Sequence, residues 1–236
     1  MNKKFVLLFV FAALTTAQIF NAQNASSCLA RPAPYPLPLI CIDPGHSRAT
    51  VGTRGKRLLE YQICWVMANR LKAELMRRGY AVILTKPNQD ANISNEDRAK
   101  TANRAHAALL IRLHCDAGNE PGIATFYPNR QGNFGGVRGP SVEVMRKSGV
   151  AAKRFHAALV RALHGALKDR GIRTDAQTAV GSKQGALTGS IYAEVPVILV
   201  EMAVLQQRHD EAFLVSEAGQ DLLTKAMADG IREAAR

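Results

Sequence analysis

Two histidines and two glutamates stand where short apolar runs end or where a helical pattern begins. His46 and His114 each follow an apolar run, Glu201 follows another, and Glu60 opens a helical pattern 14 residues after His46. Imidazole and carboxylate groups bind zinc in hydrolases, where three protein ligands leave one position for water. A further carboxylate can then act as a base. The residue types alone predict a metal site and leave open which carboxylate binds the ion.

The elements that would position these residues begin with short buried strands. Five short, mostly apolar runs are typical of strands that are buried on both faces of a sheet. They cover Leu39–Ile42, Ala81–Leu84, Ala108–Leu113, Ile123–Tyr127 and Val197–Val200. Ligands of such sheets bind beyond the carboxyl ends of the strands. We therefore expect His46, His114 and Glu201 at one edge of the sheet.

Amphipathic helices alternate with these strands. Helical spacing of apolar residues predicts helices over Glu60–Arg78, Asn95–His106, Phe155–Leu167 and Phe213–Ile231. Gly79 ends the first of them. Strands that alternate with helices of this length predict a single α/β domain, with a mostly parallel twisted sheet and helices on both faces.

Three features fall outside this pattern. Gln131–Gly149 has five glycines and no apolar period, so we expect a surface loop or insertion of roughly 20 residues. His156 and His164 are eight residues apart on one predicted helix and are expected at the surface. Arg98 is expected to be a solvated charge on a helix surface, and we leave it outside the candidate site.

The N-terminus has the pattern of a secretory signal peptide. Two lysines precede the apolar run Phe5–Leu14, and small and polar residues follow. This run is too short to span a bilayer, which takes about 20 residues. We expect a signal peptide and leader at 1–27 with an open cleavage site, a proline-rich lead-in at 28–38 and one domain at 39–236. The mature protein is expected to be exported, periplasmic or extracellular, without a stable membrane span.

The charge predicts an anionic partner. The formal net charge is +12, and 1–27 holds two lysines and no acid, which leaves 12 − 2 = +10 on the mature chain. Nucleic acid, anionic lipid and acidic wall polymers all fit this charge. Export and an aromatic content of only 6% argue against nucleic acid. The 47% hydrophobic content excludes disorder for most of the chain.

Four cysteines complete the candidate residues. An exported chain can form disulfides, and the pairing of Cys28, Cys41, Cys64 and Cys115 stays open. They have no CxxC spacing, which argues against a cysteine zinc site. Cys41 and Cys115 lie in apolar strand patterns, where a free cysteine is usually a small core residue.

A family resemblance rests on an ordered set of motifs. They are Ile42-Asp43-Pro44-Gly45-His46, Glu60, the stretch Arg98–Asn103, Leu113-His114-Cys115-Asp116-Ala117 and Val197–Glu201. Together they resemble the zinc-dependent N-acetylmuramoyl-L-alanine amidases of the AmiC type, from about Leu39 to the C-terminus. The resemblance implies that 39–236 is an amidase catalytic domain of this fold.

The resemblance also implies a chemistry. His46, Glu60 and His114 would bind Zn²⁺, and Glu201 would be the catalytic carboxylate. The substrate would be peptidoglycan, cleaved between the lactyl group of N-acetylmuramic acid and the L-alanine of the stem peptide during wall remodelling or cell separation. Asp116 follows the second histidine, and we interpret it as a group that orients the ligand histidine or its neighbours.

The chain departs from the family pattern in four places. Ser47-Arg48 stands where two glycines are usual, Cys115 replaces an alanine, Ala203 and Val204 lie near a usual Gly-Phe pair, and Gln206 or Gln207 takes the place of an asparagine. These changes affect loop shape and substrate subsites and leave the four candidate residues intact.

Two other functions stay open. One is a zinc peptidase that acts on stem peptides, and the other is a non-catalytic module that binds the wall. The sequence names no activator protein, no oligomeric state and no preferred muropeptide.

Overall fold

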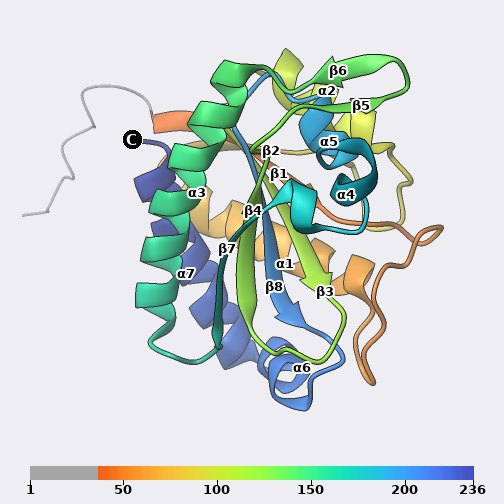
Figure 1. The fold of residues 1–236 in the computed structure, drawn as a ribbon. Helices are drawn as coiled ribbons and strands as arrows, with labels where there is room; N and C mark the ends of the chain where they lie inside the picture. The colour runs from red at the N-terminus through yellow and green to blue at the C-terminus, as the bar shows by residue number, and fades with distance from the viewer. Residues whose placement is uncertain (1–36) are drawn as a thin grey trace, which may run out of the picture. The chain divides into compact units, whose positions relative to one another are not determined.

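A six-stranded sheet forms the centre of residues 37–236, the part of the chain that this computed structural model describes (Figure 1). The strands are β1 (Leu37–Pro44), β2 (Tyr80–Leu84), β3 (Leu109–Asp116), β4 (Ile123–Tyr127), β7 (Asp169–Thr174) and β8 (Val197–Val204). Their order is β2-β1-β3-β8-β4-β7. The first four in this order are parallel, while β4 runs antiparallel to β8 and parallel to β7. The mostly parallel sheet is confirmed.

Helices cover both faces of the sheet. One face packs against α1 (Glu60–Arg77), α3 (Val142–Leu163) and α7 (Glu217–Ala234), and α3 and α7 lie side by side in Figure 1. The other face packs against α2 (Asn95–Arg104), near the short helix α5 (Thr188–Ile191). Three short helices complete the fold: η1 (Asp175–Gln177), α4 (Gly181–Gln184) and α6 (Arg208–Val215). The predicted α/β architecture is therefore confirmed.

Alternating residues of β1 show how both faces become buried. Ile40 and Ile42 join the core under α1 and α7, whereas Cys41 joins the smaller core under α2. Successive side chains of a strand point to opposite faces, so a strand buried on both sides needs an unbroken apolar run. This is why the continuous apolar runs in the sequence identified the central strands.

The helix α1 begins at Glu60, as the spacing of its apolar residues predicts. Its buried face includes Ile63, Met67 and Leu71, which pack on the sheet. The chain leaves the helix through Gly79 at a φ of +93°, a conformation that glycine adopts without a steric penalty. Packing of this apolar face fixes the helix against the sheet and so fixes the position of Glu60.

The segment Gln131–Gly149 is not the loop that the sequence suggested. It forms a hairpin of β5 (Gly132–Phe134) and β6 (Val137–Gly139), followed by the start of α3. The turn residues Gly135 and Gly136 have φ values of 58° and 80°, which a two-residue hairpin turn favours. The helix begins 13 residues before Phe155, and most of its early buried positions hold small residues such as Ser148, Ala151 and Ala152. A search for large apolar residues misses that first part.

The end of α3 and its histidines also differ from expectation. The helix ends at Leu163 and not at Leu167, with His164 in the left-handed region at a φ of 49°. His164 is exposed as predicted, but the prediction for His156 is wrong. Its Nδ1 lies 2.9 Å from Thr125 Oγ1 and its Nε2 lies 2.8 Å from Asp169 Oδ1. These partners on β4 and β7 make a buried histidine favourable.

Residues 1–36 lie outside the described part, and with them the expected signal peptide, most of the lead-in and Cys28. Within 37–236, Cys41, Cys64 and Cys115 are free and buried, which confirms the interpretation of Cys41 and Cys115 as core residues. A search of the same residues for a helix of sufficient length and apolar character to cross a bilayer finds none.

Candidate metal centre and active site

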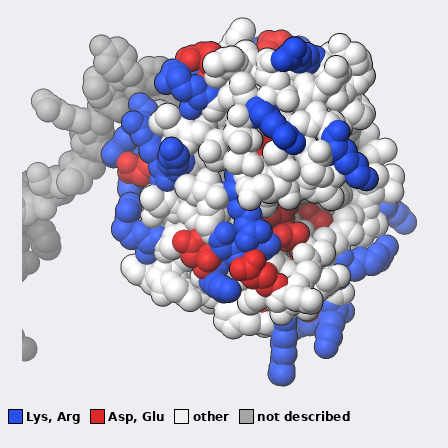
Figure 2. Space-filling model, in the orientation of Figure 1, with Lys and Arg blue, Asp and Glu red and all other residues white. Residues whose placement is uncertain are grey.

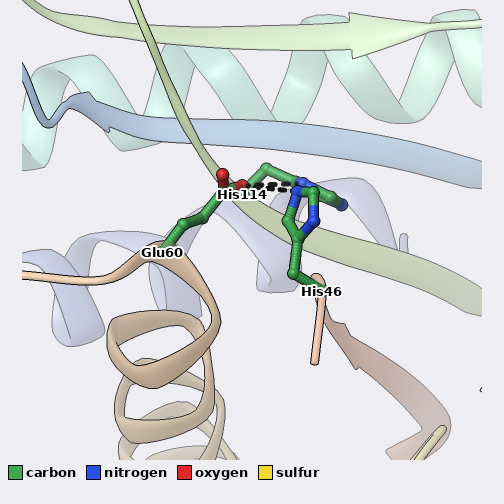
Figure 3. Close-up of side chains that lie close together, drawn as sticks. All are labelled: His46, Glu60 and His114. Carbon is green, nitrogen blue, oxygen red and sulfur yellow. Dashed lines mark hydrogen bonds and ion pairs between the residues drawn. The ribbon is translucent and has the colours of Figure 1, made fainter. Parts of the chain in front are cut away.

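His46, Glu60 and His114 converge at the carboxyl ends of β1 and β3, where α1 begins (Figure 3). Oε1 of Glu60 lies 3.1 Å from Nε2 of His46 and 3.0 Å from Nδ1 of His114. The two imidazole rings meet edge to face, with centroids 4.9 Å apart. The three candidate ligand atoms lie within 4.8 Å of one another. The predicted meeting of these three side chains is confirmed.

The backbone around His46 fixes its imidazole. His46 has a φ of 61°, which a residue with a side chain rarely adopts. Its Nδ1 lies 3.0 Å from the carbonyl of Thr50, and because a carbonyl only accepts, Nδ1 carries the proton. The other ring nitrogen, Nε2, faces Glu60 Oε1 at 3.1 Å. Gly45 permits the close approach of His114, since a Cβ there would lie 2.6 Å from its Cε1.

Glu60 is held as an anion in a buried position. Its Oε2 accepts a hydrogen bond from Thr53 N at 2.6 Å, and its Oε1 accepts one from Cys115 N at 3.1 Å. Burial alone would raise the pKa of Glu60, but the hydrogen bonds from His114 and His46 outweigh it and hold that pKa well below its usual range. The carboxylate is therefore charged and rigidly placed between the two rings.

The donor set fits a zinc ion. Two imidazoles and one carboxylate make a three-ligand zinc site of the kind that leaves a fourth position for water. Burial lowers the pKa of His114, which keeps its ring neutral and able to bind a cation. His114 Nε2 is buried and has no hydrogen-bond partner among residues 37–236. These three residues could hold a metal ion.

Glu201 lies next to this cluster on β8. It is the register partner of His114 on the neighbouring strand, and its buried Oε2 has no hydrogen-bond partner in the described part of the chain. Burial raises the pKa of Glu201 well above its usual range, and the charges of Glu60 and Asp116 add to this effect. A raised pKa suits a carboxyl group that exchanges protons near neutral pH.

A cavity of about 410 Å³ lies at this end of the sheet. His46, His114 and Glu201 line it together with the chain at 92–98 and the chain at 178–188. The face drawn in Figure 2 is hollowed near its centre, with acidic side chains in the hollow and lysines and arginines on the surface around it. The hairpin of β5 and β6 contributes no residue to the cavity lining.

A buried ion network lies beside the metal cluster, and sequence reasoning missed it. Asp43 is fully buried, with Arg98 Nη1 2.7 Å from Oδ1 and Arg112 Nε 2.9 Å from Oδ2. Burial alone would raise the pKa of Asp43, but the two guanidinium groups outweigh it and hold that pKa well below its usual range. One signal was available, because Arg112 interrupts an otherwise apolar run, and buried charges need partners.

The same network supports the loop that carries His46. The carbonyl oxygen of His46 accepts hydrogen bonds from Arg98 Nη2 at 3.0 Å and from Lys86 Nζ at 2.9 Å. Arg98 is 4% exposed, so the expectation of a solvated helix-surface charge is wrong. It is a positioning residue that ties the first turn of α2 to the end of β1.

Asp116 contacts different partners from those expected. Its Oδ2 accepts from Arg170 Nη2 at 2.8 Å and its Oδ1 from Ala117 N at 2.8 Å. Among the residues described, the ring of His114 donates its hydrogen bond from Nδ1 to Glu60 Oε1. Within residues 37–236, Asp116 thus makes no hydrogen bond to the ring of His114, and its carboxylate binds Arg170 of β7 and the backbone of Ala117 instead.

Comparisons with known proteins match this chain to one family. A family profile described as N-acetylmuramoyl-L-alanine amidase matches residues 40–233. N-acetylmuramoyl-L-alanine amidase LytC of Bacillus subtilis is 26% identical over 194 residues, which are 81% of this chain and 34% of LytC. The chain thus spans about a third of the length of this curated relative.

Solved structures share the fold. The N-acetylmuramyl-L-alanine amidase Ami1 of Mycobacterium smegmatis superposes with a TM-score of 0.70 at 19% identity, covering 84% of this chain and 96% of Ami1. An N-acetylmuramoyl-L-alanine amidase of Clostridium difficile 630 gives 0.69 at 23% identity, covering 84% of this chain and 96% of that one. With the family profile matching most of its length, this chain belongs to the N-acetylmuramoyl-L-alanine amidase family.

Proposed function

We propose that this chain is a zinc-dependent peptidoglycan amidase. It hydrolyses the amide between the lactyl group of N-acetylmuramic acid and the L-alanine of the stem peptide. The observation that carries this proposal is the meeting of His46, Glu60 and His114 in a chain of this family, beside a cavity that His46, His114 and Glu201 line. In this proposal the first three residues bind Zn²⁺ and Glu201 is the catalytic carboxylate.

Each group has a separate task in the reaction. When bound, zinc supplies Lewis-acid chemistry that polarises the scissile carbonyl and offsets the negative charge developing on its oxygen. Glu201 takes a proton from the attacking water on its unpartnered Oε2 and passes it to the leaving nitrogen. The bond from the water oxygen to the carbonyl carbon forms, and the carbon–nitrogen bond breaks. The products are the lactyl carboxylic acid and a peptide with a free L-alanine amine.

The products of digestion test the reaction. Purified sacculi are incubated with the protein, and the released material is identified by mass spectrometry. The proposal expects free stem peptides that begin with L-alanine, and glycan strands without peptides. Shortened stem peptides still attached to glycan would indicate the rival stem-peptide peptidase. Binding to sacculi without any cleavage would indicate the rival wall-binding module.

Metal analysis tests the ligand assignment separately. We expect His46→Ala and His114→Ala to lower the zinc content of the purified protein well below one ion per chain. His209→Ala is the matched control, because the side chain of His209 is 73% exposed and lies on α6. Equal zinc content in all three variants would contradict the assignment.

The remaining proposals concern where the enzyme acts. We propose that 1–27 directs export, that 28–38 is a lead-in, and that 39–236 is the catalytic domain, which acts on the wall in the periplasm or outside the cell. The net charge of +10 expected for the mature chain supports attraction to the anionic wall. N-terminal sequencing of the exported protein tests this division. An unprocessed N-terminus in the cytoplasmic fraction would contradict it.

A further inference from the structure

The guanidinium of Arg112 has one nitrogen atom, Nη1, that is free to bind a ligand. The residue is 4% exposed and lines the active-site cavity. Its Nε donates to Asp43 Oδ2 at 2.9 Å and its Nη2 donates to Asn95 Oδ1 at 2.6 Å. Nη1 has no hydrogen-bond partner among residues 37–236. Nη1 is not one of the fully buried atoms without a partner, so it is accessible from the cavity and can donate to a ligand or water there.

The surrounding backbone is shaped around this guanidinium. A Cβ added to Gly189 of α5 would lie 2.8 Å from Nη1, so only glycine leaves room there. The first turn of α2, which opens on the same cavity, adds the partial positive charge of a helix N-terminus. Its own acids are already paired, with Glu96 Oε1 2.6 Å from Lys100 Nζ and Asp97 Oδ2 2.7 Å from Ser94 Oγ. The Arg112 corner of the cavity therefore favours an anion.

The sheet register sets how far this donor is from the chemistry. Arg112 and His114 are two residues apart on β3, and their partners on β8 are Leu199 and Glu201. All four residues line the cavity. Two residues of a strand span about 7 Å. On the side of the sheet that faces the cavity, His114 and Glu201 thus lie at the reaction site. Arg112 and Leu199 lie two residues earlier on the same two strands.

We propose that Arg112 binds the free α-carboxylate of the second stem-peptide residue, a proposal that rests on the function proposed above. In an extended peptide the carbonyl carbon of the second residue lies about 7 Å from the scissile carbonyl carbon. A peptide lying along β3 with its scissile carbonyl at His114 and Glu201 thus brings this carboxylate to Arg112. Leu199 supplies an apolar wall beside it. The chain is then specific for stem peptides with D-glutamate over those with the α-amide, D-isoglutamine.

A matched pair of substrates tests this specificity. Disaccharide tetrapeptides with D-glutamate or D-isoglutamine at the second position differ only in a carboxylate or an amide. We expect kcat/KM to be at least about tenfold higher for the acid, because the amide accepts a hydrogen bond from the guanidinium but lacks the charge–charge attraction that the carboxylate adds. Most of the difference is expected in KM. Equal kcat/KM for the two substrates would overturn the proposal.

Two variants separate recognition from support. Arg112→Lys keeps a positive charge near Asp43 and removes Nη1, so the ratio of kcat/KM for acid over amide should fall toward one. Arg98→Lys is the matched control, since Arg98 binds the same carboxylate and all its guanidinium nitrogens have protein partners. It should lower kcat/KM for both substrates and leave the ratio unchanged. An unchanged ratio in Arg112→Lys would overturn the proposal.

A binding measurement keeps this test independent of catalysis. The free tetrapeptides of the two substrates, in which the γ-carboxyl of the second residue is in amide linkage, are titrated into the wild-type protein by calorimetry, after treatment with a chelator. Tighter binding of the acid supports the Arg112 subsite even if sacculi are not cleaved, an outcome that would contradict only the proposed function. Equal binding of the two tetrapeptides, or no measurable binding of either, would overturn the subsite whatever the activity. This measurement also decides the matter if Arg112→Lys does not fold.

Discussion

Asp43 and Glu201 are two buried carboxyl groups of one sheet, and their surroundings shift their pKa values in opposite directions. Asp43 ends β1 between two guanidinium groups, which outweigh its burial and hold its pKa well below the usual range. Burial and neighbouring negative charge raise the pKa of Glu201 well above its usual range, and its Oε2 has no hydrogen-bond partner within 37–236. A carboxylate with all its partners supplied stabilises the fold, and one left without a partner is available for chemistry.

This contrast predicts that the largest change in activity comes from Glu201. We expect Glu201→Gln to lower kcat for sacculus hydrolysis by about 10²–10⁴-fold, because proton transfer by a positioned side chain contributes about this much. Dye release from labelled peptidoglycan measures the rate, and elemental analysis should show that bound zinc is retained. Turnover close to that of the wild type would contradict the assignment of Glu201.

The same substitution has a second, opposite expectation for stability. An acid whose folded pKa is raised loses stability as the pH rises above its unfolded pKa. In chelator-treated protein at pH 7, Glu201→Gln should therefore unfold at the same urea concentration as the wild type or a higher one. A large loss of stability would show that Glu201 supports the fold in the way that Asp43 does.

The second prediction concerns Asp43, whose replacement should damage the fold. Asp43→Asn leaves Arg98 and Arg112 buried without their carboxylate. Breaking a buried ion pair by removing one partner costs about 3–5 kcal/mol. Urea unfolding at pH 7 measures this loss of unfolding free energy. A loss near zero would mean that the two guanidinium groups find other partners.

The third prediction uses pH to separate charge from shape. Because its folded pKa is depressed below the ordinary value of 3.8, Asp43 contributes stability that is present above about pH 4. That stability is lost as the pH falls through the folded pKa. The gap in unfolding free energy between the wild type and Asp43→Asn should thus shrink when urea unfolding is repeated between pH 4 and pH 2. A constant gap would assign the effect to packing and not to charge.

The difference between the two carboxyl groups also explains what sequence reasoning found. Glu201 follows a continuous apolar run, and His114 follows a run that is apolar apart from Arg112, so their meeting at one sheet edge follows from how parallel strands are buried. Glu60 could be placed because a regular amphipathic helix begins with it. Residues that stand at the ends of regular elements are thus predictable from local patterns.

The partners of Asp43 were not predictable in this way. Arg98 comes from a helix 55 residues later and Arg112 from a strand 69 residues later, and no local pattern records such a contact. The sequence did show a charge inside a buried strand, which signals a partner without naming it. His156 was misjudged for the same reason, since its partner Asp169 lies on an edge strand whose apolar pattern is weak.

The smallest expected effect tests how firmly Arg112 is held between Asp43 and the cavity. A methyl group at Gly189 would lie 2.8 Å from Nη1 and 2.9 Å from Cζ of Arg112, and the guanidinium is fixed by Asp43 and Asn95. Overpacking of this kind costs about 1–3 kcal/mol, so Gly189→Ala should lower the unfolding free energy by this amount.

Gly149→Ala is the matched control, because Gly149 is also helical and its Cβ would come no closer than 3.2 Å to Tyr127. Alanine favours a helix over glycine by about 1 kcal/mol and the contact with Tyr127 needs only a small shift of the ring, so this control should cost less than Gly189→Ala. If both variants are equally stable in urea, the guanidinium can shift without cost, and Asp43 then does not hold Arg112 in the single position that the carboxylate subsite requires.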